Sequence, residues 1–287
     1  MDYTVKKHFP RTEVGGISLS RLIIGTNWIA GYSHRSDAAD QMIKERHHKA
    51  ETMLPMFDTF MENGIDTIMA PFGQLPHICD AVKMTEDKWG KEMIMVDTPV
   101  VNVDDTAEGR REAEATIKAV AERGAKICLI HHYSAELLVN KNKREITRLD
   151  DYTKMIRDAG MIPGLSAHMP ELVLYSDENG YDVETYIQIY NCMGFLMQVE
   201  VEAVNGIIRN AKKPVMTIKS MAAGRTTPFV GLNFSYATIR DCDMVTVGCF
   251  NEREAAEDIE ISFAALERRG ANLAKRNSPA KNQSVLK

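Results

Sequence analysis

The sequence predicts an α/β protein whose eight parallel strands close into a (β/α)8, or TIM, barrel. Eight short apolar runs recur along the chain, each is followed by a segment with helical features, and 287 residues suit one large domain. Eight such units in a chain of this length favour a closed barrel. An open doubly wound sheet is the rival fold, but no GxGxxG follows the first apolar run.

Short apolar runs between polar or turn residues are typical of buried parallel strands. In chain order the predicted strands are RLIIGTNW (21–28), GIDTIMAPF (64–72), EMIMVDTP (92–99), AKICLIHH (125–132), MIPGLSAH (161–168), GFLMQVEVE (194–202), KPVMTIKS (213–220) and DMVTVGC (243–249). Ahead of the first strand, VGGIS (14–18) predicts the turn of a short hairpin.

Helices are predicted between these strands from the spacing of apolar residues and from their end signals. The predicted ranges are 47–61, 74–85, 105–123, 145–159, 170–174, 182–192, 205–210, 229–240 and 252–269. Gly160 suits the position just past a helix end, and Asn251 with Glu254 three residues on suits a helix start. Residues 1–270 are expected to form a single barrel domain, followed by a flexible tail over 271–287.

The composition indicates an ordinary globular protein that acts on small molecules. Hydrophobic residues make up 44%, charged residues 26%, and the net charge is −5, without a basic patch long enough for nucleic acid. The five cysteines show no CxxC spacing, which argues against disulfides or structural zinc and for a reducing compartment. No signal peptide or membrane-spanning run is apparent. We therefore expect a cytoplasmic protein with a small-molecule substrate, no nucleic-acid or membrane partner, and possible homo-oligomers.

The chain is organised around AKICLIHHYSAEL (125–137), where an apolar run ends in two histidines and a tyrosine. Side chains of a strand alternate between two faces, so His131 and His132 should point to opposite sides. One of them then faces inward at the carboxyl end of its strand, where barrel enzymes carry their chemistry. A hydrogen-bonded structural histidine is the equally open alternative.

Several segments together resemble the aldo-keto reductase family, in the order that the family has them. They are VGGISLSRLIIGTNW (14–28), LIHHYS (129–134), GLSAHMPELV (164–173), FLMQVEVEAV (195–204), IKSMAAGR (218–225) and VTVGCFNEREAAEDIE (245–260). The resemblance covers residues from about Val14 to Arg268. It implies an aldo-keto-reductase-like barrel and, in the family, NADPH-dependent reduction of carbonyl compounds.

The resemblance also implies a catalytic Asp, Tyr, Lys and His, but only one of the four matches. The family's second-strand "DTAxxYG" is replaced by IMAPFG, so its Asp falls on or beside Met69 and its Tyr on Phe72. Its third-strand Lys falls on Pro99, and His131 alone is retained. Carbonyl reduction needs a positioned proton donor, so this loss weakens the case for a reductase.

The positions that hold nicotinamide in the family are altered as well. Ser166 and Gln198 match its Ser and Gln, whereas Ala167 replaces an Asn and Lys219 stands where an aromatic residue stacks on the ring. Acidic residues follow Gly248, where NADPH binding favours Arg or Lys. We therefore expect NADPH to bind weakly or not at all.

Strand alternation suggests what replaces the reductase machinery. If Pro99, His131, Ser166 and Gln198 point inward, regular alternation also turns inward Asp97, His168, Glu200 and Glu202. Two imidazoles and two carboxylates suit a divalent metal, which predicts a metal site with the ligands Asp97, His131, His168 and Glu200. The set is similar in residue type to the ligands of metal-dependent barrel isomerases. An ion pair between Lys219 and Glu200 is the alternative.

The sequence thus leaves three functional hypotheses. The first is a non-redox, metal-assisted isomerase, epimerase or lyase that removes a proton next to the carbonyl of a sugar-like or polyol substrate. Lys219 would be its base with Glu202 nearby, His131 would be a further catalytic group, and Tyr133 would contact substrate. The second is a divergent NADPH-dependent reductase with His131 as acid. The third is a ligand-binding barrel without catalysis, in which 29–50 is a lid or an oligomer contact.

Overall fold

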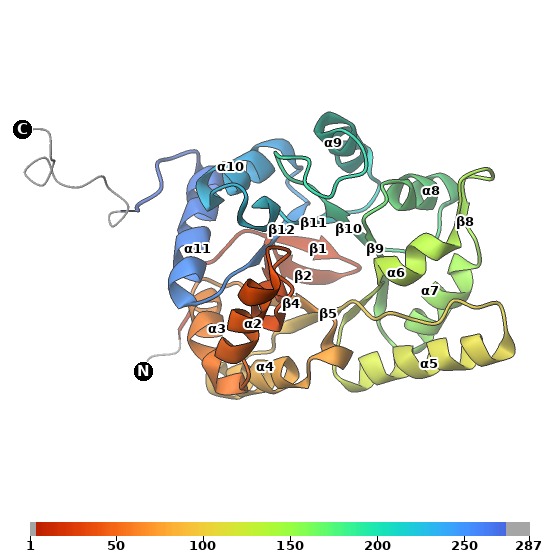
Figure 1. Ribbon diagram of the computed structural model, residues 1–287, viewed down its shortest axis with the longest axis horizontal. Coiled ribbons are helices and arrows are strands. Elements are labelled where there is room, and N and C mark those ends of the chain that lie inside the picture. The colour runs from red at the N-terminus through yellow and green to blue at the C-terminus, as the bar shows by residue number, and fades with distance from the viewer. Residues whose placement is uncertain (1–3, 274–287) are drawn as a thin grey trace, which may run out of the picture.

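A closed barrel of eight parallel strands forms the centre of the computed structural model, which describes residues 4–273 (Figure 1). The strands are β3 (Leu22–Gly25), β4 (Thr67–Ala70), β5 (Ile94–Asp97), β6 (Ile127–Ile130), β9 (Ile162–Ala167), β10 (Thr185–Ile189), β11 (Val215–Ile218) and β12 (Met244–Gly248). They pair in chain order, and β12 pairs with β3 to close the ring. The predicted fold class is confirmed.

Helices surround the barrel and cover the outer face of its strands (Figure 1). They are α1 (Asn27–Ala30), α2 (Asp37–Arg46), α3 (Leu54–Met61), α4 (Pro76–Trp89), α5 (Ala107–Glu122), α6 (His132–Ala135), α7 (Leu149–Asp158), α8 (Glu171–Asn179), α9 (Val201–Asn210), α10 (Pro228–Thr238) and α11 (Glu252–Glu267). A small antiparallel pair, β7 (Val139–Asn140) and β8 (Glu145–Ile146), lies between α6 and α7. Short 3₁₀ turns occupy 50–52, 72–74, 136–138 and 222–224.

The barrel interior is filled by apolar side chains that alternate with outward-facing ones along each strand. The interior cluster consists of Val14, Leu19, Ile23, Met69, Val96, Ile127, Leu129, Ile162, Ile187, Met216 and Met244. The neighbours of these residues along the strands pack against the helices in a second, larger cluster. Because the interior is packed, only the loops at the carboxyl ends of the strands are free to form a site.

A hairpin at the start of the chain closes the opposite end of the barrel. β1 (Arg11–Val14) pairs with β2 (Ile17–Ser20), and the two-residue turn between them has φ values of 56° and 85° at Gly15 and Gly16. Both residues of such a turn need positive φ, which glycine adopts without steric cost. The apolar side chains of Val14 and Leu19 enter the interior cluster. The hairpin predicted from VGGIS is therefore the floor of the barrel.

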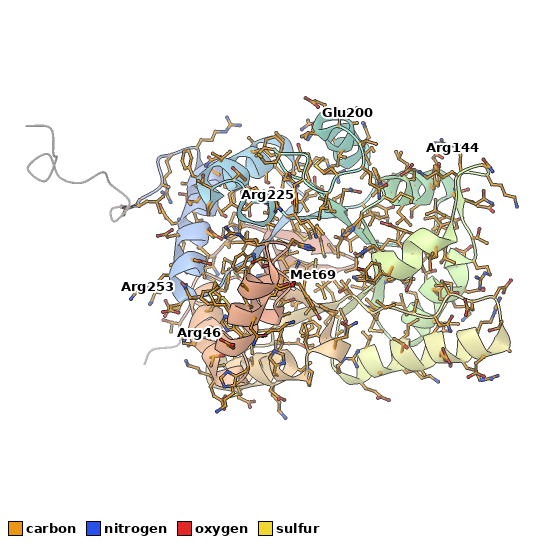
Figure 2. All side chains as sticks on the ribbon, viewed as in Figure 1. Arg46, Met69, Arg144, Glu200, Arg225 and Arg253 are labelled. Atoms are coloured by element: carbon orange, nitrogen blue, oxygen red, sulfur yellow. The ribbon has the colours of Figure 1, made fainter. Side chains whose placement is uncertain are left out.

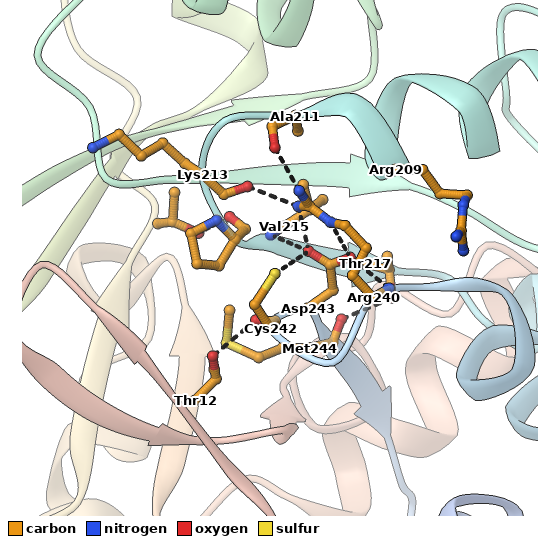
Figure 3. A network of polar contacts seen from close by, with 12 residues as sticks. Thr12, Arg209, Ala211, Lys213, Val215, Thr217, Arg240, Cys242, Asp243 and Met244 are labelled. Atoms are coloured by element: carbon orange, nitrogen blue, oxygen red, sulfur yellow. Dashed lines mark hydrogen bonds and ion pairs between the residues drawn. The ribbon is translucent and has the colours of Figure 1, made fainter.

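A polar network fixes the amino-terminal ends of β11 and β12 (Figure 3). The guanidinium of Arg240 binds both carboxylate oxygens of Asp243 and donates to the carbonyl of Lys213 at 2.9 Å. The Asp243 carboxylate also accepts the N–H of Val215 at 2.9 Å, and Thr12 of the hairpin donates to Cys242 O at 3.0 Å. The two strands whose far ends carry Lys219 and Thr246 are thereby tied to the floor.

The sixth barrel strand lies elsewhere than predicted. It is β10, inside the range 182–192 that was predicted to be a helix. The segment TYIQI is rich in β-branched and aromatic residues, which favour strands, and it is buried on both faces. The range 194–202 is a surface loop leading into α9, with Leu196 and Val199 exposed. Its apolar run mimics a strand, so the prediction was wrong by about ten residues.

The predicted tail, 271–287, lies outside the described residues from 274 onward, and residues 1–3 lie outside them too. Within residues 4–273 no helix combines the length and the apolar character that crossing a membrane would require.

Candidate active site

A cavity of about 490 Å³ opens at the carboxyl ends of the barrel strands, which is a size suited to a small molecule. The loops after β3, β4, β5, β6, β9 and β11 all contribute lining residues, and β12 contributes Thr246 and Gly248 from the strand itself. Its ionisable side chains with acid–base potential near neutral pH are one lysine and four histidines, namely Lys219, His34, His131, His132 and His168. No Asp or Glu of the described chain lines it, so no carboxylate of the lining offsets the positive charge of Lys219.

Lys219 follows directly after β11 and extends its side chain into this cavity. Its backbone has φ 63°, a left-handed conformation that costs a non-glycine residue about 1–2 kcal/mol. Within residues 4–273 the ammonium group forms no hydrogen bond or ion pair. Burial without a counter-ion lowers the pKa of Lys219 to about 8, so about a tenth of the amine is neutral at pH 7. A neutral amine is both a base and a nucleophile.

His131 lies where β6 ends and α6 begins. Its Nδ1 accepts the backbone N–H of Tyr133 at 3.3 Å, so the neutral ring carries its proton on Nε2. Burial, and then the positive charge of Lys219, lower the pKa of His131, which favours the neutral ring. The Nε2–H group is therefore available as a donor to a substrate oxygen.

His132 stacks on His168, with ring centroids 3.7 Å apart and an interplanar angle of 22°. Burial is the main cause that lowers the pKa of His132 to about 4 and that of His168 to about 3; charges on His131 and Lys219 lower the former further, and a charge on His132 lowers the latter further. The loop that carries His168 is held by Glu136, whose carboxylate accepts the N–H groups of His168 and Met169 at 2.8 Å each. Both rings are therefore neutral proton acceptors near neutral pH.

The long connection after β3 covers one side of the mouth. Tyr32, Ser33 and His34 from this connection line the cavity, and α2 follows them. The hydroxyl and backbone N–H of Ser33 both bind Asp40 of α2, which anchors the connection. The range 29–50 was expected to be either a lid or an oligomer contact, and the cavity-lining residues agree with a cover over the mouth.

Two lining residues carry hydroxyl groups without a partner. The side-chain oxygens of Ser220 and Thr246 are buried and make no hydrogen bond within the described chain. A buried polar group without a partner costs about 1–3 kcal/mol. A hydroxylated ligand that reaches these groups after a χ1 rotation would regain this energy.

Six of the ten predicted site residues line the cavity. They are Lys219, His131, Tyr133, Ser166, His168 and Gly248. Tyr133 is 68% exposed at the rim, where it can meet a ligand that enters. His132 was expected to point away from the barrel interior because it is out of phase with His131, yet it lines the cavity too. The strand ends at Ile130, so the chain turns helical at His132 and strand alternation no longer applies.

Asp97 does not face the barrel interior, contrary to the prediction. Val96 occupies the interior, so its neighbour Asp97 points to the helices and is fully buried there. The carboxylate accepts the N–H of Phe72 and binds the guanidinium of Arg123, both at 3.2 Å. Burial raises the pKa of Asp97, while Arg123 opposes the rise. At the end of β5 the residue that lines the cavity is Thr98 rather than Pro99. Because the prediction took Pro99 as inward, it assigned the inward and outward faces of the whole strand the wrong way round.

Gln198, Glu200 and Glu202 lie away from the cavity because they do not belong to a barrel strand. Gln198 is exposed on the loop before α9, Glu200 precedes the first residue of α9, and Glu202 lies in the first turn of that helix. Figure 2 shows Glu200 at the outer edge of the molecule, at the start of α9. The alternative ion pair between Lys219 and Glu200 is therefore also not formed in residues 4–273.

The predicted metal ligands are consequently not brought together. His131 and His168 share the cavity, but Asp97 and Glu200 do not, and the described residues contain no group of three His, Cys, Asp or Glu side chains placed to hold a metal ion. The four-ligand set was wrong because it depended on the phase of β5 and on the position of the sixth strand.

Two solved structures share this arrangement of elements. One, a proposed aldo-keto reductase from Pseudomonas aeruginosa, superposes with a TM-score of 0.65 at 14% identity over 92% of this chain and 98% of its own. The second, described in the same terms, gives 0.65 at 15% identity over 93% and 100%. The fold is that of an aldo-keto reductase barrel. At this identity the likeness concerns the fold alone; no protein-family model and no curated protein matches the sequence.

The cavity lacks most of the catalytic groups that the aldo-keto reductase resemblance implies. Met69, matched to the family's Asp, lines the cavity, whereas Pro99, matched to its Lys, does not, and the neighbouring Thr98 lines the cavity instead. Phe72, at the family's Tyr position, is 1% exposed and packs in the outer core instead. Of the family's catalytic groups the cavity thus contains the histidine alone, at His131.

The residues present do not fit a phosphorylated nicotinamide dinucleotide. A second recess of about 220 Å³ adjoins the cavity and shares Gly248 and Gly224 with it. Its lining carries the carboxylates of Glu254, Glu257 and Asp258 against the single guanidinium of Arg35. These carboxylates oppose phosphate groups, and the Lys219 side chain in the main cavity opposes an oxidised nicotinamide ring.

Proposed function

We propose that this protein is a non-redox enzyme that removes a proton next to the carbonyl group of a small sugar-like or polyol compound, leading to isomerisation, epimerisation or elimination. The observation that carries the proposal is Lys219, whose amine is buried in the cavity among four histidines and lacks a counter-ion. A lysine held in this way is partly neutral at neutral pH, which such proton transfer requires.

The other groups of the cavity have complementary roles in this proposal. The Nε2–H of His131 donates to the carbonyl oxygen, where negative charge develops as the proton leaves. The neutral rings of His132 and His168 receive and return protons. The unpartnered hydroxyls of Ser220 and Thr246 favour a polyhydroxylated substrate over an apolar one.

Metal assistance was part of the sequence-based hypothesis, and the arrangement gives it no support. The described residues offer no three-ligand group, so the proposal assigns the polarisation of the carbonyl to protein groups. Elemental analysis of protein purified without chelator checks this part. Stoichiometric metal in the wild type, lost in a His168→Ala variant, would restore the metal hypothesis.

The test of the proposed function is hydrogen exchange in D2O. The purified protein is incubated with dihydroxyacetone, glyceraldehyde or fructose, and proton NMR follows loss of the signals next to the carbonyl. We expect enzyme-dependent exchange with at least one compound, abolished in Lys219→Met and retained in Lys213→Met. Lys213 is the matched control because its amine pairs with Glu184 at 2.9 Å, remote from the cavity lining. Exchange no faster than without protein for all three compounds would overturn the proposal.

The alternative function, an NADPH-dependent reductase, is favoured by the fold and by His131 but opposed by the acidic recess. Titration with NADPH, followed by its fluorescence, separates the two functions. We expect half-saturation above about 100 µM, which corresponds to a binding free energy weaker than about −5.5 kcal/mol. Low-micromolar binding together with NADPH-dependent carbonyl reduction would favour the reductase.

A further inference from the structure

We propose that the Nζ of Lys219 forms a covalent imine with the carbonyl carbon of the substrate, so that this residue is a nucleophile rather than a free base. The inference rests on the proposed function, because it specifies how the carbonyl compound is activated. It also restricts the substrate to aldehydes and ketones, since esters and amides do not form imines with an amine.

The substrate carbonyl needs an electron-withdrawing group to activate it. A proton next to a carbonyl is released only if electron density is withdrawn toward the carbonyl oxygen or its replacement. The described residues contain no three-ligand metal group, and the cavity lining has no Arg. Lys219 is therefore the strongest available electron-withdrawing group, provided that it becomes part of a cationic imine.

Imidazole bases line the same cavity as the amine of Lys219. His132 and His168 are stacked, buried and neutral, and burial makes them weak bases with pKa values of about 4 and 3. Weak bases suffice for a cationic imine, whose neighbouring C–H is far more acidic than that of the parent carbonyl. With imidazoles present to take the proton, the amine is free for bond formation.

The backbone that carries the amine is fixed in place. Lys219 is fixed in a left-handed backbone conformation directly after β11, and the Arg240–Asp243 network fixes the other end of that strand. Strained residues of this kind cluster at functional sites. Within residues 4–273 the Lys219 side chain has no carboxylate partner that would keep it protonated.

The step balances without an additional reactant. The lone pair of neutral Nζ adds to the carbonyl carbon, the π electrons move to oxygen, and a proton passes from nitrogen to that oxygen through an imidazole. A second proton, taken up from solvent and passed on by an imidazole, protonates this hydroxyl, and the nitrogen lone pair forms the C=N bond as water leaves. One amine, one carbonyl and one proton thus give one cationic imine and one water. A neutral imidazole next removes the proton from the adjacent carbon, a proton returns to the rearranged carbon skeleton, and addition of water then reverses imine formation and regenerates Lys219.

The test is reductive trapping. The protein is incubated with dihydroxyacetone, glyceraldehyde or fructose and sodium cyanoborohydride, and the adducts are mapped by peptide mass spectrometry. We expect a reduced adduct on the peptide that contains Lys219, with parallel loss of exchange activity. The adduct should be absent in Lys219→Arg and retained in Lys213→Arg. If the Lys219→Arg variant does not fold by circular dichroism, mapping on the wild type alone decides.

The outcomes distinguish this inference from the proposed function. Enzyme-dependent exchange in D2O without an adduct at Lys219 would overturn the imine and leave the proposed function intact. An adduct at Lys219 without exchange would support the imine and overturn the proposed proton transfer. Adducts spread evenly over surface lysines, or no adduct and no exchange, would overturn the imine.

Discussion

Lys219 is the residue at which stability and proposed chemistry oppose each other. Its ammonium loses hydration in the cavity without gaining a carboxylate, and its backbone adopts a left-handed conformation. Both features destabilise the folded chain. The proposed reaction of its amine with a substrate would account for a cation held at this cost.

We therefore expect Lys219→Met to stabilise the protein at pH 7, by about 1–3 kcal/mol, because it replaces a buried unpaired cation by an apolar side chain of similar length. The folded-state pKa, about 8, lies below the unfolded value of 10.5, so the unfolded wild type binds more protons between these two pH values. The stability of the wild type rises with pH through this window, and the advantage of the variant shrinks.

Urea unfolding at pH 7 and pH 10 measures this effect, with Lys213→Met as the control. A variant no more stable than the wild type at pH 7 would mean that Lys219 is well solvated or paired.

The stacked histidines predict a sensitivity to acid. Below pH 6.5 the unfolded chain protonates both rings, whereas the folded chain resists protonation until about pH 4 at His132 and about pH 3 at His168. The unfolded state then binds more protons, so stability falls as the pH falls from 6.5 toward 4. His168→Phe retains a ring that can stack but that cannot be protonated. It should therefore lower the number of protons taken up on unfolding in this pH range by about one.

The pH dependence of urea midpoints from pH 7 to 4 checks this expectation, with the exposed His48→Phe as the control. Equal slopes in the wild type and in His168→Phe would contradict the neutral stack.

At the scale of elements, α5 and β5 are joined by the buried pair of Asp97 and Arg123. Removing one partner of such a pair leaves the other uncompensated. Arg123 keeps part of its exposure, so we expect Asp97→Ala to lower the free energy of unfolding by about 2 kcal/mol, at the low end for buried pairs. Exchange activity per folded molecule should stay unchanged, because Asp97 does not line the cavity.

Glu200→Ala is the matched control for Asp97→Ala. Glu200 was likewise predicted to be a metal ligand, but its carboxylate lies on the surface. The control substitution should leave both stability and activity unchanged. Loss of activity in an Asp97→Ala variant that remains folded would mean that Asp97 acts in the site.

At the scale of the whole molecule, the hairpin floor and the cavity lie at opposite ends of one packed interior. Leu19 of β2 is fully buried in that interior, together with residues of the barrel strands. Leu19→Ala should cost about 2–4 kcal/mol through lost burial and the cavity left behind. The mouth should keep its activity below the unfolding temperature.

Thermal unfolding with activity measured at 25 °C gives both quantities, and Ile17→Ala, at a partly buried neighbour, should lose less stability. A loss of activity in Leu19→Ala while the protein stays folded would show that the floor and the mouth are coupled.

The sequence by itself determined the fold class, the floor hairpin and much of the site. Eight apolar runs, a Gly-Gly turn and the residues that follow strand ends, among them His131, Ser166, His168 and Lys219, are local patterns that need no tertiary contact to be read. The alternation of side chains along a strand predicts their direction correctly where the strand is regular and its limits are clear. Around β9 this prediction is met, because Ser166 and His168 both line the cavity.

Only the tertiary structure decided which carboxylates reach the mouth and which histidines meet. Two apolar runs, 185–189 and 194–202, compete for the sixth strand, and burial between neighbouring strands selects the first. Asp97 is turned outward because Val96 is needed in the packed interior. His132 reaches His168 because the chain leaves its strand at Ile130 and begins α6. Strand choice, strand phase and strand end depend on long-range packing, which local patterns do not encode.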